Sequence, residues 1–306
     1  MLKYIGRRLL QTLIVLFIVS IFAFSLIHMA DGNPALLMVP DGASDEVIRE
    51  MERQLGLDQP LYVQYFRYMA GVFHGDLGIS TSYRIPVAQI IAERLPNSIR
   101  LTMGTVLIGC CLAIPLGIVA GANRGKATDF FAMFFALIGN SMSAVWLAVL
   151  NVFVFSVWLN LLPAMGAESF KHAILPALTL GYPMAAEITR VGRSGMIDTL
   201  SEDYITATYA KGISRRVVNW KYAFKNALIP IITLVGMSIG SYLAGAVVVE
   251  TVFAWPGIGQ LINQAVGNRD YALVQSLLLV SAALFTLINL VVDIINSLVD
   301  PRVSLE

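Results

Sequence analysis

Long apolar runs recur along the chain, and shorter polar stretches separate them. A helix of about 20 apolar residues crosses the ~30 Å hydrocarbon layer of a bilayer. Runs of this kind lie at residues 9–29, 99–122, 130–159, 173–191, 231–249 and 273–299. The pattern therefore predicts an all-α polytopic membrane protein with six transmembrane helices.

Two features inside these runs bear on how the helices pack. Residues 130–159 are too many for one straight span, and the polar sequence Asn140-Ser141-Met142-Ser143 predicts a break or a polar face inside the bundle. Small residues also recur at four-residue steps, at Ala113, Gly117, Gly121, Gly236, Gly240 and Ala244. Such faces let two helices approach closely.

The first long polar segment, residues 31–97, predicts a small helical subdomain. Ser44 is the expected cap of an amphipathic helix, and a second helix follows Pro60. Pro86 opens a third short helix that is expected to end at Pro96.

The second long polar stretch, residues 201–230, is basic and predicts two short helices. Ser201 is the expected N-cap of the first helix, which Gly212 closes. Ser214 caps the second helix, which is expected to end at Pro230. The two helices would form a protruding surface on which another protein can dock and exert force. The alternative interpretation of residues 201–230 is a solvated loop without a partner.

The charges of the short loops predict the orientation. With the N-terminus inside, the cytoplasmic side receives most of the loop lysines and arginines, as the positive-inside rule requires. Both termini and residues 201–230 are then cytoplasmic, and residues 31–97 are periplasmic.

The expected units are an N-terminal span (1–30), the periplasmic segment (31–97), a five-helix core (98–300) and a cytoplasmic tail (301–306). The first span is longer than a signal-peptide core, so it is expected to remain uncleaved.

Composition agrees with this class and excludes others. The chain is 57% hydrophobic and 13% charged, against about 25% charged in soluble domains. Its net charge of +1 argues against nucleic acid as a partner. The adjacent Cys110 and Cys111 cannot form a spaced metal site, and the three histidines lie far apart. No P-loop is present, because the sequence from Gly121 to Ala127 lacks the required spacing and hydroxyl. We therefore expect no catalytic set, no metal site and no cofactor in this chain.

Polar residues within the spans are the remaining candidates for function. A charge at the bilayer centre costs roughly 2.5–3.5 kcal/mol, so such residues face protein or water. Glu187 either pairs with Arg190, three residues on, or lines a passage together with Asn140 and Ser141. Asp293, with Asn289 a turn away, is expected to make structural contacts between helices.

Several separate motifs resemble one transporter family. Residues 201–230 resemble the "EAA" loop of ATP-binding-cassette (ABC) importer permeases in their small residues, their Gly212 and their Asn226-Ala227-Leu228-Ile229-Pro230 ending. The run from Glu250 to Gly259 (ETVFAWPGIG) and the later Asn268-Arg269-Asp270-Tyr271 resemble the dipeptide, oligopeptide and nickel branch. The same holds for residues 55–60 (LGLDQP), 74–78 (HGDLG) and 300–302 (DPR).

The resemblance implies a type I ABC importer permease whose cytoplasmic loop holds a coupling helix for an ATPase. It implies a second, homologous permease subunit, two ATPase subunits that bind ATP and Mg²⁺, and a periplasmic or lipid-anchored binding protein, all at the bacterial inner membrane. The residues it assigns to ATPase coupling are Asp203, Tyr204, Thr206, Ala207, Ala210, Lys211, Gly212 and Arg215.

The substrate stays open at this point. The family implies a peptide-like solute such as a dipeptide, an oligopeptide or glutathione, with a nickel chelate or an opine as the alternative. A secondary transporter and a membrane scaffold are the rivals from other classes. An ATPase that co-purifies with the chain would argue against both.

Overall fold

The computed structural model describes residues 2–29, 39, 42 and 44–299, so the tail predicted at 301–306 and part of segment 31–97 lie outside the described residues. The described chain is helical, apart from turns and one isolated bridge between Ile79 and Pro86. Its helices are α1 (Leu2–Met29), α2 (Asp45–Leu55), α3 (Leu61–Phe73), α4 (Val87–Ala122), α5 (Ala127–Ser141), α6 (Ala144–Asn151), the π-helix η2 (Val152–Trp158), α7 (Phe170–Leu200), α8 (Asp203–Ala210), α9 (Arg215–Val217), the π-helix η3 (Val218–Ala223), α10 (Phe224–Leu243), α11 (Val247–Val252), α12 (Ile258–Gly267) and α13 (Tyr271–Val299).

Four helical stretches in the described part are long and apolar enough to cross a membrane: Gly6–Ser25, Val87–Ala122, Arg215–Leu243 and Tyr271–Leu298. A fifth is added if α5 and the α6–η2 helix count as one span, which bends by 106° at Met142. The predicted break at residues 140–143 is therefore confirmed. Ser143 caps the helix after the break by accepting a hydrogen bond from Val145 N at 3.2 Å.

The remaining predicted span, residues 173–191, corresponds to α7, which does not meet the same test of length and composition. This helix carries Glu187, Arg190 and Arg193, and it packs against α4, α5 and α10. A helix surrounded by protein needs fewer apolar residues than one that faces lipid on all sides. The count of six spans stays a prediction.

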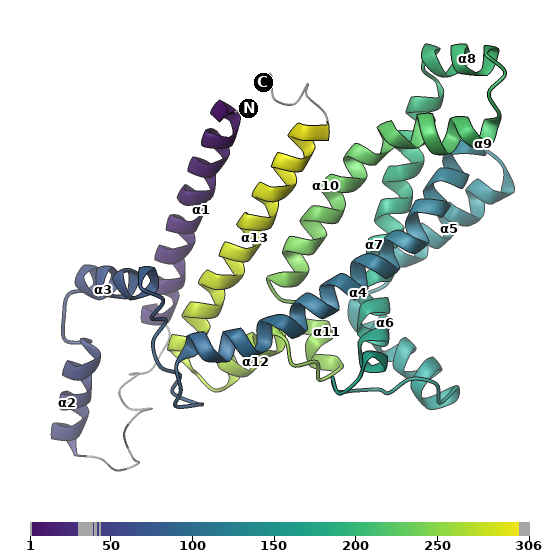
Figure 1. Ribbon diagram of the computed structural model, residues 1–306. Coiled ribbons are helices and arrows are strands. Elements are labelled where there is room, and N and C mark those ends of the chain that lie inside the picture. Colours follow the sequence, from purple (N-terminus) through teal and green to yellow (C-terminus); the bar gives the residue numbers. More distant parts are fainter. Residues whose placement is uncertain (1, 30–38, 40–41, 43, 300–306) are drawn as a thin grey trace.

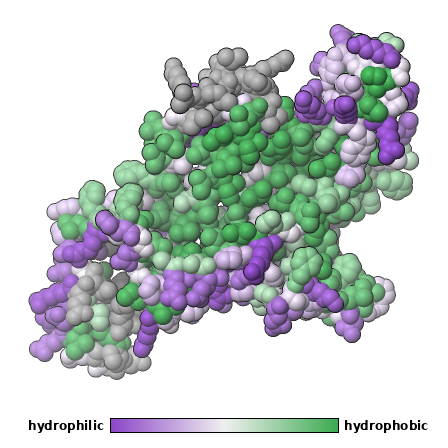
Figure 2. All heavy atoms as spheres, in the orientation of Figure 1, coloured by the Kyte–Doolittle hydropathy of each residue, from purple (hydrophilic) through white to green (hydrophobic). Residues whose placement is uncertain are grey.

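The long helices lie side by side, with α1 next to α13, α13 next to α10, and α10 next to α7 (Figure 1). The start of α1, the end of α13 and α8 share one end of the molecule, and α12 lies at the other (Figure 1). Apolar surface covers the middle of the visible face, and hydrophilic residues gather around α8 and at the opposite end (Figure 2). This is the distribution that a bilayer around the middle would require.

Glycines bring the helices together as the four-residue spacing predicted. A Cβ at Gly121 would overlap Met196 of α7, and a Cβ at Gly236 would overlap Val292 of α13. At Gly117 a Cβ would lie 3.2 Å from the backbone oxygen of Thr189. Both small-residue faces are therefore helix contacts.

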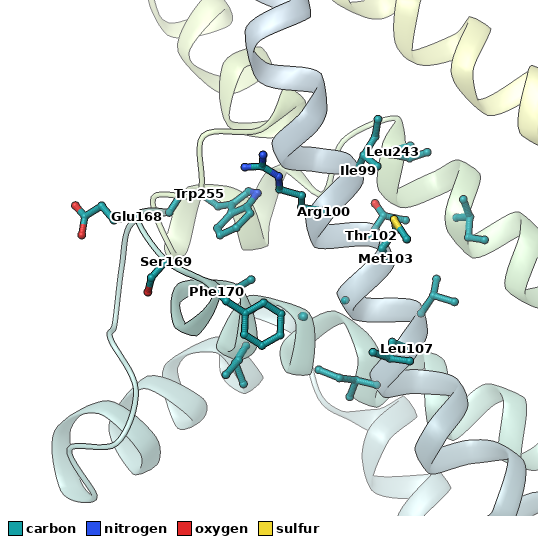
Figure 3. Close-up of a pocket in the computed structure, with 18 residues that line it drawn as sticks. Ile99, Arg100, Thr102, Met103, Leu107, Glu168, Ser169, Phe170, Leu243 and Trp255 are labelled. Carbon is teal, nitrogen blue, oxygen red and sulfur yellow. The ribbon is translucent and has the colours of Figure 1, made fainter.

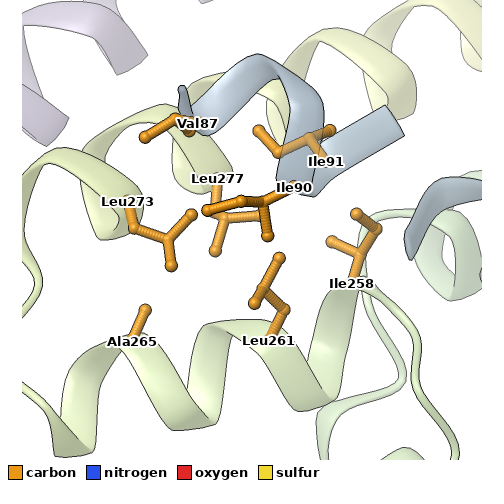
Figure 4. Packing of buried hydrophobic residues seen from close by; sticks show 8 residues of the cluster. All are labelled: Val87, Ile90, Ile91, Ile258, Leu261, Ala265, Leu273 and Leu277. Carbon is orange, nitrogen blue, oxygen red and sulfur yellow. The ribbon is translucent and has the colours of Figure 1, made fainter. Parts of the chain in front are cut away.

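The predicted helix ends at Pro96 and Pro230 are wrong. Helix α4 runs through Pro96, so residues 87–97 belong to the same helix as the second span, and α10 runs through Pro230. Packing outweighs the hydrogen bond that each proline removes. The first turns of α4 pack against α12 and α13 through a buried cluster (Figure 4), which consists of Val87, Ile90, Ile91, Ile258, Leu261, Ala265, Leu273 and Leu277. Around Pro230, Ala227 and Ile231 are buried against other helices.

Candidate functional site

Helix α8 is a short helix whose ends are fixed by local chemistry. Glu202 is the N-cap, with extended backbone (φ −73°, ψ 144°), and Asp203 lies in the first turn, where the helix dipole favours a carboxylate. Lys211 is the C-cap, and Gly212 follows with φ +77°, a conformation that favours glycine. Ser201 ends α7 instead of capping α8, which corrects the predicted cap by one residue.

The inner face of α8 is anchored to the bundle. Ile205 is fully buried in a cluster with Ile118 of α4, Met196 of α7 and Val218 of η3. Asn226 Nδ2 donates to the Tyr204 hydroxyl at 2.6 Å, which ties α8 to the start of α10. These contacts attach α8 to the end of α7 and to the start of α10.

The outer face of α8 is open, and the residues that the sequence assigned to coupling lie on α8, in the turn after it and at the start of α9. All of them are exposed: Asp203, Tyr204, Thr206, Ala207, Ala210, Lys211, Gly212 and Arg215. Ala207, Ala210 and Gly212 leave this surface with little side-chain bulk. The helix projects beyond the rest of the bundle at its end (Figure 1). Its geometry is that of a small convex element that can enter a groove of another protein.

An ion pair below α8 joins α5 to α7, and sequence reasoning missed it. Arg193 Nε donates to Asp129 Oδ1 at 2.5 Å, and Arg193 Nη2 donates to Asp129 Oδ2 at 2.9 Å. Gly125 N donates to the same carboxylate at 2.9 Å. The two partners are 64 residues apart, so no local spacing could reveal them.

The candidate pathway residues lie along the contact of α5 with α7. With its amide oxygen turned toward α7, Asn140 accepts hydrogen bonds from Arg190 Nη1 and Nη2 at 3.2 and 3.3 Å. Of the two alternatives for Glu187, the ion pair with Arg190 is not formed, because Arg190 contacts Asn140 and no carboxylate lies within 4.0 Å of it in the described chain. Glu187 is exposed on the surface of this chain. The hydroxyl of Ser141 donates to Leu137 O at 2.8 Å.

The polar residues of α13 contact other helices. Asp293 pairs with Arg8 of α1 across 3.1 Å, and Asn296 Nδ2 donates to Thr233 Oγ1 of α10 at 2.8 Å. Asn289 is half-buried on the same helix. These contacts hold α1 and α10 against α13.

The motif from Glu250 to Gly259 closes the end of the bundle opposite α8. Glu250 is fully buried, and it accepts hydrogen bonds from Ser98 Oγ at 3.0 Å and from Gln260 N at 2.9 Å. Burial raises the pKa of Glu250. A Cβ at Gly257 would overlap the Glu250 carboxylate, so glycine is required there.

Trp255, in the same motif, is also held against α4. It is 3% exposed, and its Nε1 donates to Asn97 O at 3.0 Å, while Asn97 Nδ2 donates to Pro256 O at 3.0 Å. Asn97 and Ser98 lie directly after Pro96. The motif from Glu250 to Gly259 is therefore held against this segment of α4 by their hydrogen bonds.

A cavity of about 920 Å³ lies between α4, α7 and α10 (Figure 3). Its walls are mostly apolar, and its polar members are Arg100, Thr102, Glu168 and Ser169. Across the described residues, no group of three or more His, Cys, Asp or Glu side chains is placed to hold a metal ion.

Comparisons with known proteins agree along the whole chain. Residues 113–305 match the family described as "Binding-protein-dependent transport system inner membrane component", and residues 1–102 match its N-terminal counterpart. The glutathione transport system permease protein GsiC of Escherichia coli O6:H1 is 42% identical over 303 residues, which cover 99% of both chains. The dipeptide transport system permease protein DppB of Alkalihalophilus pseudofirmus is 39% identical and covers 99% of this chain and 100% of its own.

A solved structure shares the fold. An inward-facing structure of the MetNI methionine ABC transporter aligns with a TM-score of 0.59 and 18% identity, over 69% of this chain and 97% of that one. A second crystal form of the same transporter gives a TM-score of 0.61 at 16% identity.

Proposed function

The chain belongs to the family of binding-protein-dependent transport system inner membrane components, and from that premise we propose that it forms half of the translocation pathway of an ATP-driven importer for peptide-like solutes. Relatives that match over their full length are named for glutathione and dipeptide transport, which supports a small peptide as the substrate. A second homologous permease subunit would complete the pathway. A binding protein would deliver the solute from the periplasmic side.

Both termini and α8 are placed on the cytoplasmic side in this proposal. The excess of Lys and Arg in the loops at that end of the bundle supports this orientation. Two ATPase subunits, which bind ATP and Mg²⁺, would dock there, one for each permease subunit.

The mechanism follows from how α8 is mounted. Its buried Ile205 and its Tyr204–Asn226 hydrogen bond join it to α7 and α10, while its outer face stays free for a partner. If the ATPases move on binding nucleotide, α8 moves with them and the ends of α7 and α10 follow. Nucleotide can bias the permease only if the docked α8 makes better contacts in one state than in the other. The anchored inner face combined with an open outer face is the observation that carries this proposal.

The test replaces Gly212 with Glu. No heavy atom lies within 4 Å of the position that a Cβ would occupy at Gly212, so the new side chain adds bulk and charge to the docking face without a clash inside the chain. We expect ATP-dependent uptake of labelled glutathione or dipeptide to be lost, while the protein stays in the membrane and loses its co-purifying ATPase.

Gly42→Glu is the matched control. Gly42 also has a positive φ, +83°, and open space around its Cβ position, and it lies before α2 and outside α8. The backbone strain is similar and the added charge is the same, so uptake should persist. Normal uptake by Gly212→Glu would refute docking through α8. Ion-driven uptake by this chain alone in proteoliposomes would instead identify a secondary transporter.

A further inference from the structure

The cavity between α4, α7 and α10 opens onto the outer surface of this chain. It lies in the half of the bundle away from α8. Its lining comes from the middle of α4 (residues 99–108), the first turns of α7 with the three residues before it, the last turns of α10, and Trp255. Met103 and Leu107, one turn apart on α4, are 68% and 65% exposed, and Phe170 is 82% exposed. The cavity is therefore a groove with an apolar floor, and this floor lies within the apolar run of α4.

Arg100 lines this groove and makes few polar contacts with the rest of the described chain (Figure 3). Its one polar contact among the described residues is Asn97 Oδ1, at 3.5 Å. No carboxylate of the described chain lies within 4.0 Å of it. A guanidinium has five N–H donors in a rigid fork. Most of this donor capacity is free.

The other charged member of the lining does not neutralise Arg100. The Glu168 side chain points away from the groove (Figure 3), and its carboxylate lies 3.5 Å from His172 Nε2. The groove therefore combines an apolar floor with one uncompensated cation at its edge.

Arg100 lies where the apolar run of α4 begins, which is where a membrane-spanning helix would enter the bilayer. Asn97, which contacts Trp255 and Pro256, lies just before it on α4, and the apolar run follows it. An arginine at this level extends toward the headgroups, and aromatic residues such as Phe170 are common there.

We propose that this groove binds an anionic phospholipid of the periplasmic leaflet, with the phosphate on Arg100 and an acyl chain along Met103 and Leu107. Arginine pairs with phosphate through two parallel hydrogen bonds. A hydrophilic peptide in transit would leave its polar groups without partners on the apolar floor. A lipid whose headgroup carries an ammonium gains nothing near Arg100, because no carboxylate is there to receive it. The proposal needs only the membrane location of α4, so it can fail without affecting the transport function.

The test uses phosphatidylglycerol with a photoreactive diazirine in its acyl chain, added to membranes that contain the assembled transporter. Labelling of residues 99–108 is measured relative to the exposed apolar residues Leu287 and Val291 of α13, which report contact with bulk lipid. Phosphatidylcholine with the same chain is the comparison lipid. We expect the labelling ratio to be about fivefold higher for phosphatidylglycerol.

Two variants decide the result. Arg100→Gln should bring the two lipids to the same ratio, whereas Arg94→Gln, on the same helix but outside the groove, should leave the preference intact. Equal ratios in the unmodified protein, or a preference that survives Arg100→Gln, would overturn the proposal. Labelling of α13 without any labelling of residues 99–108 would also overturn it, because protein would then cover the groove.

Discussion

Glu250 shows how a single buried carboxylate can organise one end of the molecule. It receives hydrogen bonds from α4 and from the first turn of α12, so three elements meet on one side chain. The sequence placed this residue in a recognisable motif. The fully buried network around it depends on Ser98, which is 152 residues away and carries no signal of its own.

The stability contribution of Glu250 depends on pH. Burial raises its pKa above the ordinary value of 4.5, so the folded protein binds this proton more tightly than the unfolded chain does. The contribution is complete below pH 4.5 and is lost as the pH rises through the raised pKa. Glutamine has the shape of the protonated acid. Glu250→Gln should therefore gain thermal stability relative to the unmodified protein as the pH rises, measured as the unfolding midpoint in detergent between about pH 4 and pH 8. Parallel pH profiles for the two proteins would contradict this.

Glu187 is the residue whose role in transport is most open to a direct test. It is exposed within α7, without an ion-pair partner in the described chain, so in the membrane it faces either water or another subunit. If it lines the passage, Glu187→Gln should lower the initial uptake rate of a dipeptide with a free ammonium group by a factor of about 3–10.

Two controls sharpen this prediction. An N-acetylated dipeptide lacks the ammonium group, so its uptake should not respond to the substitution. Asp198→Asn removes an exposed carboxylate from the end of the same helix and should have no effect. Unchanged uptake of every substrate by Glu187→Gln would exclude the pathway role.

At the scale of elements, local patterns predicted which segments are helical better than where the helices end. The break at residues 140–143 was visible because polar residues interrupt a run that is too long for one span. The ends expected at Pro96 and Pro230 were wrong, because a proline's cost was weighed without the packing of Val87, Ile90 and Ala227 on distant helices. A proline signal is local, whereas the burial that outweighs it comes from residues far along the chain.

The contact of α10 with α13 depends on Gly236. A Cβ there would overlap Val292, so Gly236→Ala should overpack the contact and destabilise the protein by roughly 1–3 kcal/mol. Shortening the opposing side chain with Val292→Ala should restore much of the loss, measured as the thermal unfolding midpoint in detergent. Gly267→Ala, which meets no atom within 4 Å, is the control. If Gly236→Ala matches that control, the two helices are not in contact at this point.

At the scale of the whole molecule, the motif from Glu250 to Gly259 is packed at one end of the bundle, and α8 projects from the other end (Figure 1). The Glu250 motif, the α12 cluster and Trp255 fix the end of α4 that lies away from α8. The Asp129–Arg193 ion pair joins α5 to α7 near α8, so motion of α8 would move several helices together. The sequence predicted α8 and its exposed residues well, because caps, turn glycines and charge are local properties. The contacts that hold α8 to α4, α7 and α10 join residues far apart in the sequence, so only the structure could show them.

Cross-linking from α8 tests the central claim most directly. Cys110 and Cys111 are first replaced by Ala, and Ala207→Cys then places one thiol on the outer face of α8. In inverted membrane vesicles that contain the assembled transporter, a bifunctional thiol reagent should join this cysteine to the ATPase subunit, and the yield should change when nucleotide is added. Labelling of the same cysteine by an impermeant maleimide added to the outside of intact cells, with no ATPase adduct in the vesicles, would contradict the account.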